Sequence, residues 1–154
     1  MVVSERALKW AMRIYPPLLL QRIWVMEFHK GFMGVNVKIA RSILNINYNR
    51  SIFGGTIFCA ADPFYPILFH EILLRRGYKT RIWVKHTEVD FIKPGRTSLY
   101  FEIRLSKEDI EEVCTVLQSG EKFLKTYLTE VSDKNGQLCA LVKNEIYIRH
   151  LIEA

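Results

Sequence analysis

The chain has 154 residues, 49% of them hydrophobic and 25% charged, a mixture typical of one folded domain with a substantial core. This composition excludes large-scale disorder. The formal net charge of +6 suits a polyanionic partner, such as a nucleic acid, an anionic membrane surface or a phosphate-bearing small molecule, and it can equally serve solubility alone. The basic residues are scattered without a Lys/Arg run, so we expect no nucleic-acid tail and no nucleic-acid partner.

Three cysteines and four histidines are dispersed along the chain, with no Cys-x-x-Cys pair and no metal-ligand spacing. We therefore expect no metal site, and we expect free thiols in a reducing compartment. The apolar run at residues 18–26 is interrupted by Gln21 and Arg22 and is too short to span a bilayer. No small-residue cleavage site accompanies it. These features predict a cytoplasmic protein without a membrane span.

Residues 1–30 are predicted to form an N-terminal helical segment. Ser4 can cap a helix that ends near Ile14, because Pro16 cannot continue it. A second, short helix is expected over residues 17–23, with Pro17 at its first position. Residues 31–150 are predicted to form the core of a single domain that comprises residues 1–154.

The first half of this core is predicted to contain a strand followed by a long helix. Residues 35–46 alternate apolar and polar side chains, which indicates a strand, and an Asn-rich loop follows at 45–50. Residues 55–76 carry apolar side chains on two adjacent helical stripes, which is typical of a buried central helix. Pro63 and Pro66 remove backbone donors, so we expect this helix to kink or to begin after Gly55.

The second half is predicted to be mostly strands, at residues 81–91, 99–105, 122–131 and 138–149. Turns are expected at residues 93–96 and 133–136, with Gly136 supplying a positive φ. A helical insert begins after Ser106, whose spacing to Asp109 matches a capping pattern, and it ends at Gly120. The whole order predicts an α+β fold in which one long central helix packs on an antiparallel sheet.

Asp62 is the only formal charge between Arg50 and Glu71, and apolar residues surround it in the sequence. A carboxylate in such surroundings is costly unless it is paired, and loss of water would raise its pKa above the ordinary value of about 3.9. Such a group can act as a general base or orient a water molecule. Alternatively, an Asp that precedes Pro63 can cap a helix starting at that proline. The residues alone leave both interpretations open.

Gly54 and Gly55 stand at the predicted start of the same helix. Glycines there leave backbone N–H groups approachable, and these groups, with the helix dipole, can hold a thioester carbonyl oxygen as negative charge develops on it. The alternative is a flexible loop.

The run from Phe53 to Phe64, Phe-Gly-Gly-x-x-Phe-x-x-Ala-Asp-Pro-Phe, resembles the DUF4442 family, an uncharacterised branch of the hotdog-fold thioesterase superfamily. The resemblance covers about residues 14–149 and includes the strand entry at residues 82–84, the turn at 91–95 and the acidic helical insert at 107–121. The Gly-Gly pair followed seven positions later by Asp62, with Asn47 upstream, is also similar to thioesterases of the phenylacetate-pathway type.

This resemblance implies a hotdog fold with N-terminal helices and one helical insert. It implies a homo-oligomer, either a dimer or a tetramer, in which two subunits form one continuous sheet and the active sites lie between them. The implied reaction is hydrolysis of an acyl-CoA or other acyl thioester, with coenzyme A as part of the substrate and no separate cofactor.

In this reading Asp62 acts as the general base or the nucleophile, and the Gly55 N–H polarises the thioester carbonyl. Among the implied substrate-binding residues, the basic side chains of His86, Lys93 and Arg96 would contact the coenzyme A phosphates. The implied substrate-binding residues are Asn47, Phe53, Gly54, Thr56, Tyr65, His86, Lys93 and Arg96.

Phe53 departs from the phenylacetate-type pattern, which usually has His at this position. The departure motivates a second hypothesis, a non-catalytic hotdog protein that binds acyl thioesters or fatty acyl chains. A third hypothesis, salt-dependent nucleic-acid binding, rests on charge alone.

Overall fold

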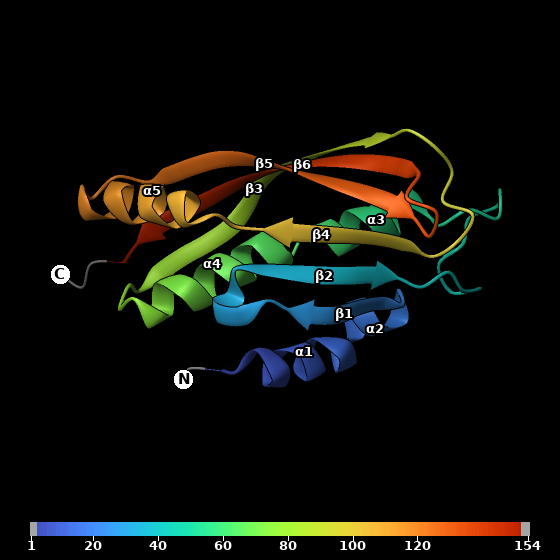
Figure 1. The fold of residues 1–154 in the computed structure, drawn as a ribbon. Coiled ribbons are helices and arrows are strands. Elements are labelled where there is room, and N and C mark those ends of the chain that lie inside the picture. Colours follow the sequence, from blue (N-terminus) through green and yellow to red (C-terminus); the bar gives the residue numbers. More distant parts are fainter. Residues whose placement is uncertain (1–2, 152–154) are drawn as a thin grey trace.

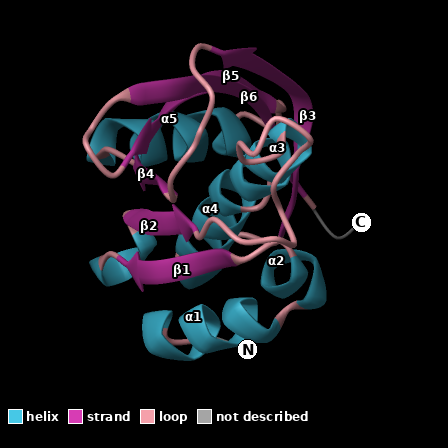
Figure 2. Ribbon diagram, turned by 90° about the vertical axis from the view of Figure 1, so that its right-hand side faces the viewer, coloured by secondary structure: helices cyan, strands magenta, loops and turns pink. Residues whose placement is uncertain are grey.

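A computed structural model describes residues 3–151 as one antiparallel sheet that curves around a long helix (Figure 1). Six strands lie in the order β1-β2-β4-β5-β6-β3, and the strands enclose α3 and α4 when the molecule is viewed from its end (Figure 2). The predicted α+β class is therefore confirmed.

The strands are β1 (Ile23–Phe28), β2 (Gly34–Ile39), β3 (Thr80–Phe91), β4 (Leu99–Arg104), β5 (Phe123–Asp133) and β6 (Leu138–His150). The helices are α1 (Glu5–Ile14), α2 (Pro16–Leu20), α3 (Gly54–Ala61), α4 (Phe64–Arg75) and α5 (Lys107–Gln118), with a 3-10 helix, η1 (Lys30–Phe32).

The central helix is interrupted at Asp62 and Pro63, which separate α3 from α4. Pro63 has no N–H to donate to the carbonyl four residues earlier, so the helical ladder cannot pass through it. The predicted kink is confirmed. By length and composition, the combined stretch Gly54–Arg75 is the one candidate membrane span among residues 3–151, and 56% of its most apolar window is buried inside the domain.

The core lies between α4 and the concave face of the sheet. Seven of the twelve residues of α4 are buried. The Phe64 ring meets Phe101 of β4 edge-on at 5.9 Å between centroids, and Phe69 packs against Phe123 and Tyr127 of β5. Each such side chain contributes about 1.5–3 kcal/mol through burial, so α4 is a principal source of stability.

The N-terminal segment differs in part from the prediction. Ser4 caps α1 by accepting a hydrogen bond from the Ala7 N–H, as expected. The second helix ends at Leu20, however, and a strand begins at Ile23, where a helix was predicted. Ile23 and Val25 point into the core while Met26 is exposed, so this apolar run is an outer strand of the sheet with only one fully buried face.

The strand predicted over residues 35–46 is shorter than expected, because β2 ends at Ile39. The following loop is organised by the buried side chain of Asn45. Its Oδ1 accepts from the Ser42 N–H at 2.9 Å, and its Nδ2 donates to the carbonyls of Gln21 and Ala40 at 2.8 and 2.9 Å. An Asn that satisfies this many backbone groups stabilises a loop in preference to a continued strand.

The second half of the fold matches its prediction. Ser106 and Asp109 form the predicted capping box of α5, and Gly136 has a φ of 79° in the hairpin between β5 and β6. The sheet has one weakly joined seam: β4 and β5 pair only at Leu99↔Asp133 and Tyr100↔Ser132. In Figure 1 the two strands diverge from there, and α5 lies at the open end.

Candidate active site

The start of α3 presents two backbone donors without partners. The Phe53 N–H donates to the Asn45 carbonyl at 2.9 Å, and the Phe53 carbonyl accepts from the Thr56 N–H at 2.9 Å, so the helix begins directly after Phe53. Within residues 3–151, the N–H groups of Gly54 and Gly55 donate to no acceptor. They are free first-turn donors of the kind that bind an oxyanion.

At both positions an aromatic ring lies so close to the backbone that a side chain larger than hydrogen would contact it. A Cβ on Gly54 would stand 2.8 Å from Cζ of Phe91, and a Cβ on Gly55 would collide with the ring of Phe53. Both rings are themselves largely exposed, at 56% for Phe53 and 60% for Phe91. The free amides therefore lie beside two aromatic rings that solvent can reach.

Two hollows flank this helix start. One, of about 360 Å³, brings together three of the predicted residues, Asn47, Gly54 and Lys93, with Phe91 and Pro94. The other, of about 340 Å³, is lined by three further predicted residues, Phe53, Gly55 and Thr56, together with Gln21, Leu44, Asn45 and Ile46. The Thr56 side chain itself is buried.

Asp62 lies at the opposite end of α3, where the helix is interrupted. Its side chain is exposed, and within the described part of the chain it forms no ion pair or hydrogen bond. Loss of surrounding water raises its pKa above the ordinary value, and no charged neighbour offsets this. Helix α4 has Pro63 as its N-cap residue and no side-chain cap, so the interpretation of Asp62 as the N-terminal cap of this helix is wrong. Asp62 is instead the C-cap residue of α3.

Cys59 lies one turn before Asp62 and is partly buried. Burial raises the pKa of its thiol, and the negative charge of Asp62 raises it further. A thiol with a raised pKa is a poor nucleophile at neutral pH. Cys59 is therefore not favoured as a nucleophile at this helix interruption.

Asn47 has a structural contact as well as a place in the first hollow. Its Oδ1 accepts from the Ser51 N–H at 3.1 Å and from the Ser51 hydroxyl at 3.0 Å, which closes the loop at residues 47–51. Its side chain is thus held in one orientation beside Gly54.

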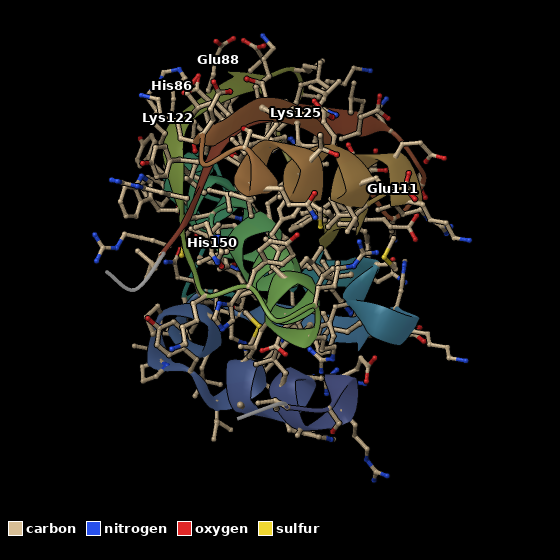
Figure 3. All side chains as sticks on the ribbon, turned by 90° about the vertical axis from the view of Figure 1, so that its left-hand side faces the viewer. His86, Glu88, Glu111, Lys122, Lys125 and His150 are labelled. Carbon is tan, nitrogen blue, oxygen red and sulfur yellow. The ribbon has the colours of Figure 1, made fainter. Side chains whose placement is uncertain are left out.

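Four predicted residues line neither hollow: Asp62, Tyr65, His86 and Arg96. Tyr65 is buried in the core, where its ring stacks on Tyr127 at 4.8 Å and its hydroxyl shares a hydrogen bond of 3.2 Å with Thr129. His86 is exposed on β3, on the outer side of the sheet near Glu88 (Figure 3). Arg96 is exposed after the turn that carries Lys93.

A polar contact at the helix interruption was not predicted from the sequence. The side chain of Asn144, on β6, is fully buried and donates from Nδ2 to the Ala61 carbonyl at 2.9 Å. Thr87 of β3 donates from its hydroxyl to Asn144 Oδ1, also at 2.9 Å. The available signal was the position of Asn144 between Val142 and Ile146, where strand alternation places an amide on the buried face.

The chain belongs to the DUF4442 family, a domain of unknown function whose model matches residues 4–148. This confirms the family that the sequence motifs indicated. Among curated proteins, no sequence match was found.

Solved structures of thioesterases are similar to the whole chain. PA5026 from Pseudomonas aeruginosa, described as a "probable thioesterase", superposes with a TM-score of 0.80 and 17% identity over 98% of this chain and 99% of the other. Thioesterase HI1161 from Haemophilus influenzae gives 0.71 and 10% identity, covering 99% and 95%. The PaaI protein of the Escherichia coli phenylacetic acid degradation operon gives 0.60 and 14% identity, covering 98% of each. At these identities the similarity shows the fold, which is the hotdog fold.

Proposed function

We propose that this protein hydrolyses an acyl-CoA thioester, with Asp62 as general base or nucleophile and the Gly55 N–H as the group that polarises the carbonyl. The observation that carries the proposal is Asp62 itself: an unpaired carboxylate of raised pKa at a helix interruption, in a hotdog fold. A carboxylate without a structural partner and with a pKa nearer neutrality is suited to accept a proton from water.

The reaction balances with these groups alone. As general base, Asp62 takes a proton from water while the water oxygen attacks the thioester carbon, and the developing oxyanion is held by the Gly55 N–H. Collapse of the tetrahedral intermediate breaks the C–S bond, and the coenzyme A thiolate takes the proton back. As nucleophile, Asp62 attacks the thioester carbon, the C–S bond breaks and the coenzyme A thiolate leaves. Water then hydrolyses the mixed anhydride, which frees the acid and Asp62, and the proton released from water goes to the thiolate.

The length of α3 requires that the two groups come from different subunits. Gly55 and Asp62 are seven residues apart, so about 1.5 Å per residue separates them by roughly 10 Å along the helix. Both must lie about 3 Å from one reacting carbonyl group. One chain cannot meet this condition, whereas a second copy related by a two-fold axis can supply the missing group.

The edge of the sheet formed by β3 supports such pairing. β3 has twelve residues and lies at the end of the sheet, with β6 as its neighbour on one side only. The opposite edge strand, β1, has α1 packed beside it (Figure 1). A long edge strand without cover is a template for another strand, so β3 is the expected line of contact between two copies.

Coenzyme A would be recognised at the rim of the first hollow. Lys93 and Arg96 are exposed on the loop that follows β3, and cationic side chains there can contact the phosphates of the nucleotide. The acyl group would lie among the apolar residues near Ile52, Ile57 and Phe91.

The direct test is release of free thiol from a panel of acyl-CoA substrates with short, long and aromatic acyl groups. Asp62→Ala is expected to lower kcat by about 10²–10⁴-fold with the fold retained. The matched control is Glu111→Ala, which removes an exposed carboxylate on α5, away from β3 and from both hollows, and should leave kcat unchanged. Absence of thiol release with every substrate at micromolar enzyme would overturn the proposal.

A mixing experiment tests the shared site separately. Gly55→Pro removes the N–H in the first helical turn, where proline is tolerated. Gly55→Ala keeps the N–H but places the same Cβ against the Phe53 ring, so it controls for that collision. Refolding an equimolar mixture of the Asp62→Ala and Gly55→Pro chains should restore about a quarter of wild-type activity, because half of the dimers are hybrids with one of their two sites intact. A mixture no more active than its components would exclude a site built from two chains.

One observation favours the second hypothesis, a non-catalytic acyl binder. The Phe53 ring lies directly over Gly55, at the position where the phenylacetate-type pattern has His. Saturable binding of acyl-CoA without turnover would support this function. Hydrolysis that Asp62→Ala abolishes would exclude it.

A further inference from the structure

The most unusual polar group in the core is the side chain of Asn144. It has no exposed surface, and it lies on the inner face of β6 in the same apolar layer as Val142 and Ile146. A buried amide destabilises a core unless hydrogen bonds compensate for the lost water. Asn144 has two such bonds, to the Ala61 carbonyl and from the Thr87 hydroxyl, each 2.9 Å long.

The Ala61 carbonyl is the acceptor that the helix interruption exposes. In an uninterrupted helix it would accept from the Tyr65 N–H, four residues later. Within the described part of the chain no backbone N–H reaches it, and Asn144 Nδ2 takes that place. A side chain from the sheet, Asn144 of β6, thus provides the hydrogen bond that the helix interruption removes from the Ala61 carbonyl.

That carbonyl is also directly linked to the proposed catalytic group. The C=O of Ala61 and the N–H of Asp62 belong to one planar peptide unit, so a hydrogen bond that fixes the carbonyl also fixes the plane from which the Asp62 Cα extends. Thr87 is the register partner of Asn144 across β3 and β6, and its hydroxyl sets which way the amide of Asn144 faces.

We propose that Asn144, oriented by Thr87, is a positioning residue that holds Asp62 at the angle required for thioester hydrolysis. This inference rests on the proposed function and adds a residue pair that the sequence motifs do not contain. Displacements of about 1 Å in a catalytic group can cost about 10²-fold in rate, so a residue of this kind should affect kcat more than KM.

The experiment compares four variants with wild type, each checked for folding by circular dichroism and thermal melting. Asn144→Leu removes both hydrogen bonds and keeps a side chain of similar size. Thr87→Val removes only the orienting hydroxyl, and Thr87→Ser retains it. Thr129→Val is the matched control, because it deletes a threonine hydroxyl that is more deeply buried than that of Thr87 and whose partner is Tyr65 on α4 instead of the helix interruption.

We expect Asn144→Leu to lower kcat by about 10- to 100-fold with KM changed less than about threefold, and Thr87→Val to lower kcat by a smaller factor. Thr87→Ser and Thr129→Val should keep wild-type kcat. An Asn144→Leu protein that is folded and fully active would overturn the inference, as would equal losses in Thr87→Val and Thr129→Val. If Asn144→Leu does not fold, the two Thr87 variants decide the question.

A readout without turnover separates this inference from the proposed function. The titration of the Asp62 carboxyl carbon can be followed by ¹³C NMR of Asp-labelled protein, with the signal assigned from its absence in Asp62→Asn. We expect the Asp62 signal and its titration midpoint to move in Thr87→Val but not in Thr129→Val. Lack of thiol release by wild type would end the hydrolysis proposal, whereas an unmoved Asp62 signal would end the positioning role.

Discussion

The two halves of the central helix are both largely apolar, but they have different surroundings. α4 is enclosed by the sheet, with seven of its twelve residues buried and aromatic contacts to β4 and β5. α3 has hollows on both sides of its first turn, exposed rings at Phe53 and Phe58, and two amides without acceptors in the described structure. The comparison shows one helix divided by a proline, with one half providing packing and the other providing accessible polar groups.

The largest effect should come from α4 and should be confined to stability. Leu73 has no exposed surface, so Leu73→Ala is expected to lower the free energy of unfolding by about 2–5 kcal/mol through lost burial and a residual cavity. Urea denaturation measures this change. If α4 contributes only packing and α3 the catalytic groups, kcat per folded molecule should stay at the wild-type value. A loss of kcat that accompanies the loss of stability would contradict this separation of roles.

The pH dependence of kcat should reflect the environment at the end of α3. Only the ionised Asp62 can accept a proton, and loss of water raises its pKa, so activity should fall about tenfold per pH unit below a midpoint that lies above the ordinary Asp range. A kcat profile from pH 4 to 9 measures it. An acid midpoint at or below the ordinary Asp value would contradict the raised pKa.

The protonation of Asp62 should affect stability in the opposite sense to activity: activity needs the ionised carboxylate, whereas the fold is more stable when this group is protonated. Because the folded-state pKa is raised, the protonated form favours the fold, and the cost of ionisation is absent at low pH and appears as the pH rises through the folded-state pKa. Asp62→Asn should therefore unfold at a slightly higher urea concentration than wild type at pH 7, with no difference near pH 3. The gain is small because the side chain is exposed.

The smallest effect is expected at the rim of the first hollow. Lys93 is exposed, so its contact with a phosphate should contribute about 0.5–1 kcal/mol, and Lys93→Ala should raise KM for acyl-CoA about two- to fivefold with kcat unchanged. High salt should reduce the difference. Lys122→Ala, which removes an exposed lysine between α5 and β5, is the control; an equal rise in KM there would indicate a general effect of charge.

Much of the fold could be predicted from local patterns. The alternation at residues 99–105, the Ser106–Asp109 capping box and the Gly136 turn each depend on near neighbours, and all three are present. Strand β1 was missed because consecutive apolar residues do not distinguish a strand from a short helix. Strand β2 was predicted too long because the loop that ends it depends on Asn45, and one of the backbone contacts of Asn45 is with Gln21, 24 residues upstream.

The candidate site could be predicted only as a set of residues. Their positions in the sequence and the family resemblance singled out Asp62 and the glycine pair, but their roughly 10 Å separation follows from α3 being a regular helix. Tyr65 follows Asp62 by three residues, which in an unbroken helix would place both on one face. The interruption at Pro63 leaves Asp62 exposed and Tyr65 in the core, and no local pattern predicts this.

The short pairing between β4 and β5 has a consequence for how the domain can open. Only two residue pairs join β1-β2-β4 to β5-β6-β3 at that seam, whereas β5 and β6 pair along almost their full length. Backbone groups that line such a boundary exchange hydrogen more readily than those inside continuous ladders. We therefore expect the two parts of the sheet, which α4 bridges by packing Phe64 on β4 and Phe69 on β5, to separate during partial unfolding before either one melts.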